Sequence, residues 1–160
     1  MIFITVGSQK FQFNRLLEAV DKLVEKQIIT DEVFAQIGYS NYKPQNYAFK
    51  PFLNRDEFAE LTSRADIVIT HGGTGAIIGA VKKGKKVIAV PRLAKYGEHV
   101  DNHQLQLIEQ FRDLDLICAC EDGDLEKAID TVKRTVYKEY KSNTHTIINS
   151  IEGYLEEHQL

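Results

Sequence analysis

Short apolar runs alternate with longer amphipathic stretches along the chain. Five of these runs have the composition and length of buried strands: 2–6, 32–37, 67–70, 87–90 and 116–120. A shorter strand is expected near Ala48 and Phe49. Strands that alternate with helical patterns are typical of βα units, in which helices cover both faces of a parallel sheet. The pattern therefore predicts a single α/β domain over residues 1–160, with a doubly wound, Rossmann-like parallel sheet.

The stretches between the strands carry apolar residues at helical spacing, and polar residues mark where two of them begin. Asn54 with Glu57, and Asp101 with Gln104, have the spacing of a capping box. In that motif two side chains and two backbone amides at the start of a helix bond reciprocally. A shorter helix is expected at 76–83, directly after a glycine-rich turn.

Two segments each have two interpretations. The lysines at 82–86 could attract an anionic bilayer, although the end of one helix and the start of a strand explain them more simply. The final stretch, 143–160, is an amphipathic helix that packs on its own domain or docks on a partner chain. Its apolar stripe consists of Ile147, Ile148, Ile151, Tyr154 and Leu155.

The turn from Thr70 to Gly75 joins a predicted strand to a predicted helix. Glycines let the backbone approach an anion closely, and the first amides of the following helix point at it. Such a turn is therefore suited to binding a phosphate group. Tight packing between a strand and a helix produces the same pattern, so the turn alone leaves both interpretations open.

Composition narrows the class of protein. A chain of 160 residues that is 43% hydrophobic has the size and core of one ordinary domain. Its formal net charge of -3 gives no general attraction to nucleic acid, so no nucleic-acid partner is expected. Cys118 and Cys120 stand two residues apart on one strand face, where a disulfide is geometrically poor, and free thiols indicate a reducing compartment. A reducing compartment favours a cytoplasmic location. No apolar run approaches the roughly 20 residues of a membrane span, so any membrane attachment is expected to come from a partner.

A ligand of a doubly wound sheet is expected outside the carboxyl ends of its strands. Four loops converge there: 7–13, 38–47, 70–75 and 92–102. The loops, together with the two residues that follow the last of them, carry hydroxyl groups, aromatic rings, one arginine, three histidines, and an acid with amides. The residues concerned are Ser8, Thr74, Tyr39, Tyr42, Tyr96, Arg92, His71, His99, His103, Asp101, Asn102 and Gln104. This inventory suits a nucleotide that carries a sugar.

Four motifs occur together in one order: the segment from Ile4 to Ser8, the turn from His71 to Gly75, Val90-Pro91-Arg92, and the segment from Tyr96 to Gln104. In this order they resemble the single-domain glycosyltransferases that correspond to the donor-binding, C-terminal half of a two-domain GT-B enzyme such as the peptidoglycan UDP-N-acetylglucosamine transferase. Within that group the chain is most similar to bacterial capsule and exopolysaccharide galactosyl- or glucuronosyltransferase subunits. The cytosolic subunit of the eukaryotic UDP-N-acetylglucosamine transferase that acts on dolichol-linked sugar is a further relative.

The resemblance implies an inverting hexosyltransferase with a UDP-sugar donor. A membrane-anchored subunit would bind the lipid-linked saccharide acceptor and hold this chain at the inner face of the membrane. The resemblance places His71, Gly72, Gly73, Thr74 and Gly75 at the diphosphate and the adjacent ribose or sugar. It assigns the donor sugar to Asp101, Asn102, His103 and Gln104, the floor of the cleft to Gly7 and Ser8, and further substrate contacts to Arg92 and Glu98.

One position departs from that family pattern. Related full-length transferases bind the ribose hydroxyls with an acid at the position of Gly79, so that either Glu98 replaces it or nucleotide binding is looser. The resemblance implies that neither a metal nor a cofactor takes part, and the four loops expected at the site contain no Asp-X-Asp motif to bridge a divalent ion to the phosphates. The catalytic base is expected on the partner or at the junction, with His71 and His99 as outside candidates.

Two other functions compete with the transferase. A non-catalytic nucleotide-sugar-binding or enhancer module would keep the glycine turn and lack activity even with its partner. A nucleotide-sugar epimerase of similar architecture normally needs a second domain, which 160 residues do not provide.

Overall fold

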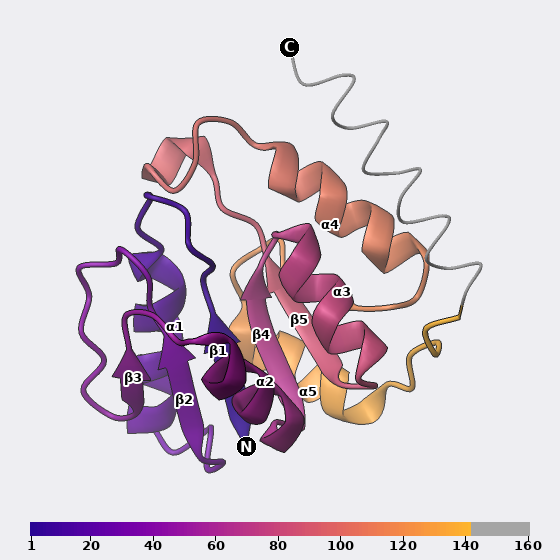
Figure 1. Ribbon diagram of the computed structural model, residues 1–160, viewed down its shortest axis with the longest axis horizontal. Helices are drawn as coiled ribbons and strands as arrows, with labels where there is room; N and C mark the ends of the chain where they lie inside the picture. Colours follow the sequence, from indigo (N-terminus) through magenta and orange to yellow (C-terminus); the bar gives the residue numbers. More distant parts are fainter. Residues whose placement is uncertain (142–160) are drawn as a thin grey trace.

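The computed structural model describes residues 1–141, and within them the chain forms one parallel sheet of six strands (Figure 1). The strand order is β3-β2-β1-β4-β5-β6. The strands are β1 (Ile2–Thr5), β2 (Val33–Gln36), β3 (Ala48–Lys50), β4 (Ile67–His71), β5 (Lys86–Val90) and β6 (Cys118–Ala119). The predicted helix at 143–160, with its apolar stripe, lies outside the described residues.

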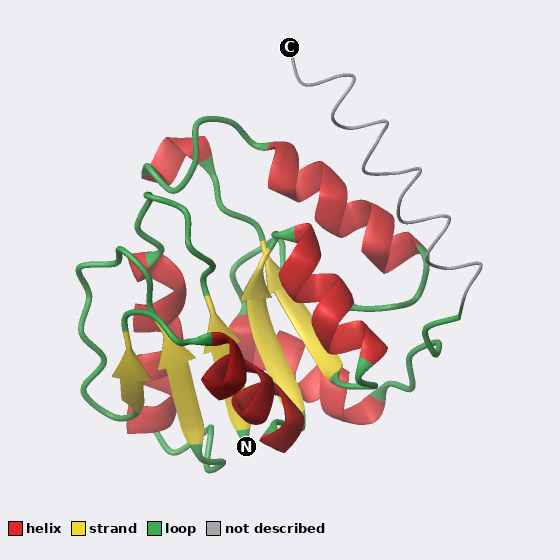
Figure 2. Cartoon of the chain, viewed as in Figure 1, coloured by secondary structure: helices red, strands yellow, loops and turns green. Residues whose placement is uncertain are grey.

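Helices cover both faces of the sheet (Figure 2). One face carries α1 (Asn14–Glu25) and α5 (Leu125–Arg134), and the other carries α2 (Arg55–Arg64), α3 (Thr74–Lys82) and α4 (His103–Asp113). A short 3-10 turn, η1 (Ala94–Tyr96), lies in the loop before α4. None of the helices within residues 1–141 has the length and apolar character that crossing a bilayer requires.

Alternating side chains of β1 show how the two cores are built. Ile2 and Ile4 belong to the buried cluster beneath α1 and α5, whereas Phe3 belongs to the cluster beneath α2, α3 and α4. Successive side chains of a strand point to opposite faces, so a strand covered on both sides must be apolar throughout. This explains why the strands appear in the sequence as continuous apolar runs.

The direction of strand addition reverses at β1. The strand pairs with β2 on one side and with β4 on the other, so that Thr5 lies level with both Gln36 and Thr70. In open parallel sheets the loops that leave the two strands at such a reversal diverge and form a crevice for a ligand. The crevice here lies between the loop that follows β1 and the turn that follows β4.

The predicted strands agree with the observed ones to within one or two residues, except at 116–120. There only Cys118–Ala119 pairs in the sheet, although Leu116 and Ile117 are buried. Both thiols, those of Cys118 and Cys120, are free, as predicted.

Of the two predicted capping boxes, one is confirmed and one is wrong. At the start of α2, Asn54 Oδ1 accepts from Glu57 N at 2.8 Å and Glu57 Oε1 accepts from Asn54 N at 3.2 Å. At the start of α4 the N-cap residue is Asn102, which makes no side-chain cap bond, and Asp101 accepts instead from the His103 amide. The Gln104 side chain is buried and bonds elsewhere.

Gly79 provides a test of the α3 assignment. It lies within this helix at an exposed position, and a Cβ built on it meets no described atom within 4 Å. Gly79→Ala should raise the free energy of unfolding by about 1 kcal/mol, because alanine in an exposed helix interior loses less backbone entropy than glycine. Urea denaturation followed by circular dichroism measures this change.

Gly73→Ala is the contrasting control on the same segment. Its Cβ would lie 2.6 Å from His71 Nε2, so this variant should be destabilised. If Gly79→Ala instead lowered the free energy of unfolding, Gly79 could not lie at an exposed position inside a helix.

Candidate functional site

A cavity of about 480 Å³ opens at the crevice between β1 and β4. Backbone and polar groups from the loops after these strands form one wall, and apolar side chains from the loop before α2 and from α2 itself form the other. The cavity is lined by Thr5, Gly7, Ser8, Gln9, Gln36, Phe52, Leu53, Phe58, His71, Gly73, Gly75 and Ala76. It therefore lies where a doubly wound sheet binds its ligand.

The imidazole of His71 is held between two glycines. A Cβ on Gly7, whose φ is +77°, would lie 2.5 Å from His71 Nε2, and a Cβ on Gly73 would lie 2.6 Å from the same atom. Only glycine leaves room for the ring at these two positions. The glycine-rich turn thus has a second purpose beyond the backbone approach expected from the sequence, since it accommodates the side chain of its own histidine.

The amino end of α3 faces the cavity without a side-chain cap. Gly73 is the N-cap residue, and Gly75 and Ala76 in the first helical turn line the cavity. The first amides of a helix have no intrahelical acceptor and carry the positive end of the helix dipole. A Cβ on Gly75 would meet no described atom within 4 Å, so a ligand can approach the backbone there. This end of the helix is suited to an anion.

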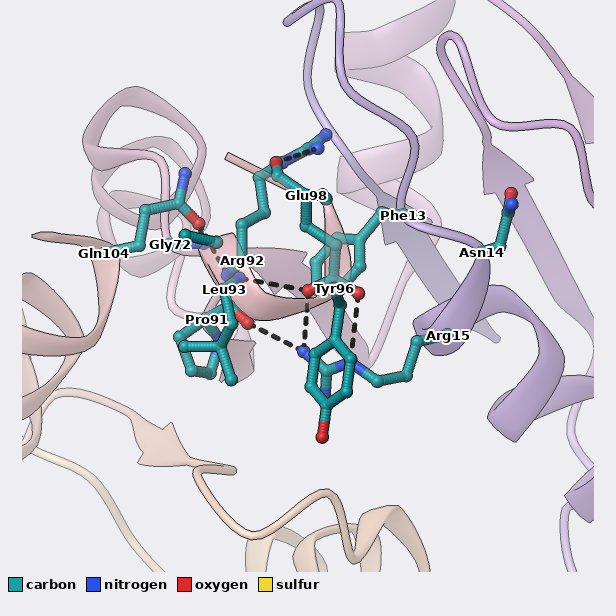
Figure 3. Close-up of polar contacts among 12 residues, drawn as sticks. Phe13, Asn14, Arg15, Gly72, Pro91, Arg92, Leu93, Tyr96, Glu98 and Gln104 are labelled. Atoms are coloured by element: carbon teal, nitrogen blue, oxygen red, sulfur yellow. Dashed lines mark hydrogen bonds and ion pairs between the residues drawn. The ribbon is translucent and has the colours of Figure 1, made fainter. Parts of the chain in front are cut away.

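Gln104 connects the turn after β4 to the loop after β5. Its Oε1 accepts from Gly72 N and from Arg92 N, each at 3.0 Å (Figure 3). Its Nε2 lies 3.2 Å from His71 Nδ1. The side chain is only 2% exposed. In this structure Gln104 therefore holds two loops together and is not presented to a sugar. The same contacts explain why it does not complete a capping box.

Gln36 has the corresponding role on the other side of the crevice. Its Oε1 accepts from Thr5 Oγ1 at 2.7 Å and from the amides of Val6 and Gly7 at 3.2 Å, and its Nε2 donates to Gly7 O and Pro51 O at 3.0 Å. Sequence analysis missed this residue. A polar side chain at the carboxyl end of an otherwise apolar strand was the available signal, because a buried amide there must find partners.

Arg92 lies fully buried beneath the loop that follows β1. Its guanidinium donates to the carbonyls of Phe11, Glu98 and Val6, while its Nε has no hydrogen-bond partner among residues 1–141. Burial lowers the pKa of Arg92 to about 10, so the group remains charged at neutral pH. Arg92 is thus a fixed positive charge below the site, and it is not among the residues that line the cavity.

Glu98 is also engaged below the surface. Its carboxylate accepts from Arg15 Nε at 3.0 Å, from Arg15 Nη2 at 2.9 Å and from Leu93 N at 3.0 Å (Figure 3). The side chain is 1% exposed. The structure therefore does not offer this carboxylate to a ribose, which argues against the first of the two alternatives, that Glu98 replaces an acid at Gly79.

His99, Asp101 and His103 form a cluster on the loop that leads into α4. Asp101 Oδ1 contacts Nδ1 of both histidines, at 3.2 Å for His99 and more closely for His103. Burial lowers the pKa of His99, and the His103 ring acts in the same direction. The three ligand atoms lie within 4.8 Å of one another, a spacing that one cation could bridge. The bonds to Asp101 fix the ring positions without one.

His71 is neutral at physiological pH. It is 5% exposed, and burial, together with Arg92 and His99, lowers the pKa of His71 to about 3. A neutral imidazole has one donor nitrogen and one acceptor nitrogen. What His71 offers to the cavity therefore depends on which nitrogen carries the proton.

The structure separates the predicted site residues into three groups. Those that line the cavity are Gly7, Ser8, His71, Gly73 and Gly75. Those buried beneath it or packed against its supports are Gly72, Arg92, Glu98 and Gln104. Those at the starts of α3 and α4 are Thr74, Asp101, Asn102 and His103.

A second cavity, of about 520 Å³, lies at the opposite, amino-terminal end of the strands, where β5 begins. It is lined by the lysines of 82–86 and by residues 136–140. Lys85 Nζ donates to Ser63 O at 2.7 Å and Lys83 Nζ to Ala59 O at 3.4 Å, so two of these lysines bond to the backbone of α2. This cavity is remote from the carboxyl ends of the strands and from His71.

The sequence of the chain is similar to those of two fungal transferase subunits. It is 30% identical over 124 residues to the UDP-N-acetylglucosamine transferase subunit ALG13 of Candida glabrata, in a match that covers 77% of this chain and 59% of the relative. It is 31% identical over 161 residues to the ALG13 subunit of Yarrowia lipolytica, covering 90% of this chain and 76% of the relative. The chain thus spans about three fifths of the first relative.

The fold is shared with larger structures. Acinetobacter baumannii MurG superposes with a TM-score of 0.58 at 17% identity, over 94% of this chain and 49% of that chain. Likeness at this identity shows the fold, which is that of one half of a GT-B glycosyltransferase. Residues 1–157 match the glycosyltransferase family 28 C-terminal domain. The chain therefore belongs to the glycosyltransferase family 28 C-terminal domain family.

Proposed function

We propose that the cavity binds the diphosphate of a UDP-sugar and that the chain supplies the donor half of an inverting hexosyltransferase. The observation that supports this most is the convergence of two hydrogen-bonding elements on one space. The uncapped amino end of α3 and the Nε2 edge of His71 both border the cavity, and the buried charge of Arg92 lies below.

Each of these groups favours a leaving diphosphate. As the bond between sugar and phosphate breaks, negative charge accumulates on UDP, and groups already oriented toward that charge stabilise the transition state without reorganising. The amides of Gly75 and Ala76 are fixed by the helix, and the ring of His71 is fixed by its glycine neighbours. The fold itself therefore keeps these hydrogen-bonding groups oriented toward the position of the diphosphate.

The apolar wall of the cavity suits the base. Phe52, Leu53 and Phe58 lie on this wall, and the Phe52 side chain is 47% exposed. The rings of Tyr39 and Phe52 pack in a T-shaped arrangement, with their centroids 5.2 Å apart. A uracil ring can stack on such an exposed aromatic side chain while its diphosphate extends toward α3. The Gly7–Ser8 backbone lies between these two regions and would form the floor beneath the ribose or sugar.

The acceptor half would come from another chain. This chain covers 49% of MurG, and its relatives in yeasts are named as subunits. We therefore expect a membrane-anchored partner that binds a lipid-linked saccharide and holds this chain at the cytoplasmic face of the membrane. The catalytic base would lie on the partner or at the junction. Of the sugars, N-acetylglucosamine is the first to test, while a role in capsule or exopolysaccharide synthesis rests on the sequence resemblance.

Nucleotide binding is expected to depend on the amino end of α3. Ala76→Asp should weaken UDP binding by about tenfold, or about 1.4 kcal/mol, because it adds a negative charge beside the phosphates. An acid in the first turn of a helix favours the helix, so the variant should remain folded. Isothermal titration with UDP, GDP and UMP measures the affinity and the contribution of the second phosphate.

Ala59→Asp provides the matched control, since it adds the same charge at an exposed position of α2 that does not line the cavity. It should bind UDP as the wild type does. Equal UDP affinity in Ala76→Asp and the wild type would place the diphosphate elsewhere.

Gly79 tests the position of the ribose. Gly79→Glu should increase the preference for UDP over 2′-deoxy-UDP by roughly tenfold, the effect of one hydrogen bond to a charged group. Gly79 lies one helical turn beyond Ala76 and has room for a side chain. Titration of both nucleotides into the variant and into Gly79→Ala measures the ratio. An unchanged ratio would contradict a ribose beside α3.

Activity distinguishes the transferase from a non-catalytic enhancer. The chain alone should transfer no sugar, and the chain co-expressed with its membrane-anchored partner should transfer one sugar from a panel of UDP-sugars to a polyprenyl-diphosphate saccharide, with inversion at the anomeric carbon. Radiolabelled donors and proton NMR of the product measure both outcomes. Transfer by the isolated chain would contradict the split enzyme, and binding without transfer in the complex would favour the enhancer.

A further inference from the structure

The amide of Gln104 fits its surroundings in only one orientation. One terminal atom lies 3.0 Å from both Gly72 N and Arg92 N, which are backbone donors. That atom must therefore be the carbonyl oxygen, because an NH₂ group there would face two N–H groups and leave all of them unsatisfied. The other terminal atom, 3.2 Å from His71 Nδ1, is consequently the nitrogen.

This orientation determines the tautomer of His71. The amide nitrogen of Gln104 can only donate, so His71 Nδ1 must accept with its lone pair. In a neutral imidazole the single ring proton is then on Nε2. Nε2 is the ring atom that lies between Gly7 and Gly73, residues that also line the cavity.

We propose that Gln104 is a positioning residue that holds His71 in the Nε2–H tautomer, so that the imidazole presents a hydrogen-bond donor to the cavity and not a base. Two backbone amides from separate loops fix the glutamine, and the glutamine fixes the histidine. Neither link requires a bound nucleotide. The inference rests on the proposed function in one respect only, which is that a diphosphate is the anion that accepts the hydrogen bond from Nε2–H.

The inference changes the role open to His71. A base that accepts the proton of an acceptor hydroxyl needs a free lone pair toward the substrate. The lone pair of His71 is directed at Gln104, away from the cavity. His71 therefore stabilises the leaving diphosphate by donating a hydrogen bond, and the base for the acceptor must be another group.

The charges that surround His71 agree with a neutral ring. Arg92, on the loop after β5, and His99, on the loop before α4, both disfavour a second proton on this imidazole. Gln104 itself, on α4, adds no charge. The ring therefore remains singly protonated at neutral pH, which is the condition under which the tautomer is defined.

Long-range ¹H–¹⁵N spectra of the histidine rings test this proposal in the full chain at neutral pH without nucleotide. The wild type should show His71 protonated at Nε2 and unprotonated at Nδ1, with the signals assigned by their loss in His71→Asn. A wild-type spectrum with Nδ1 protonated would overturn the proposal, whatever the behaviour of any variant.

Gln104→Glu provides the second arm. One carboxylate oxygen can still accept from Gly72 N and Arg92 N, while the other accepts a hydrogen bond from His71 Nδ1, which must then carry the ring proton. The Nδ1 signal should therefore shift from the unprotonated to the protonated range. Gln106→Glu, the same change at an exposed position of α4, should leave it unchanged. A folded Gln104→Glu protein with Nδ1 still unprotonated would also overturn the proposal.

Addition of UDP to the wild type separates the positioning role from the proposed function. A shift of the Nε2 signal with Nδ1 still unprotonated would support both. If the apo tautomer is as expected but UDP leaves the Nε2 signal in place, the positioning role stands and the diphosphate assignment fails.

Discussion

The site depends most on the hydrogen bonds that the buried guanidinium of Arg92 donates to backbone carbonyls. The guanidinium donates to the carbonyls of Val6 and Phe11, at the end of β1 and in the loop after it, and to the carbonyl of Glu98, and so joins two loops that are more than 80 positions apart in the sequence. No carboxylate among the described residues bonds to it directly. A buried charge of this kind is tolerated because several carbonyl dipoles face it, and its N–H groups in turn satisfy those carbonyls. Glu98 adds to this arrangement, since its carboxylate bonds to Arg15 and to the Leu93 amide.

Two buried glutamines complete the support of the cavity. Gln36 fixes the loop after β1 through the amides of Val6 and Gly7, and Gln104 fixes the turn after β4 through the amide of Gly72. An amide side chain suits this purpose because it both donates and accepts, and can therefore pair with backbone on either side of a crevice. These hydrogen bonds are already formed without a ligand, and groups oriented in advance can stabilise charge without reorganisation.

Much of the fold could be predicted from the sequence because the signals are local. A parallel sheet that is covered on both faces requires apolar strands, and a helix that follows a strand directly requires a tight glycine turn, so the segment from Ile67 to Gly75 was recognisable. The capping box of Asn54 and Glu57 was predicted for the same reason, since both its bonds join residues three positions apart.

The failures share one cause, which is dependence on distant partners. Gln104 has the local spacing of a capping residue, but its amide bonds to Gly72, which lies 32 positions earlier. Glu98 lies in a polar loop and reads as available to a ligand, yet it pairs with Arg15, 83 positions earlier. Gln36 was missed because it ends an apolar strand, and its partners lie 15 and about 30 positions away. No local pattern contains this information.

The same long connections affect how the protein is made. The hydrogen bond from Arg92 to Val6 O joins residues 86 positions apart. Ribosomes add about 5–20 residues per second, so the first strand and its loop wait roughly 5 to 20 seconds before their anchor has been synthesised. During that interval Gly7 and the residues after it have no fixed conformation imposed by Arg92. During synthesis, the support that Arg92 gives to the cavity therefore cannot form before the loop after β5 has been made.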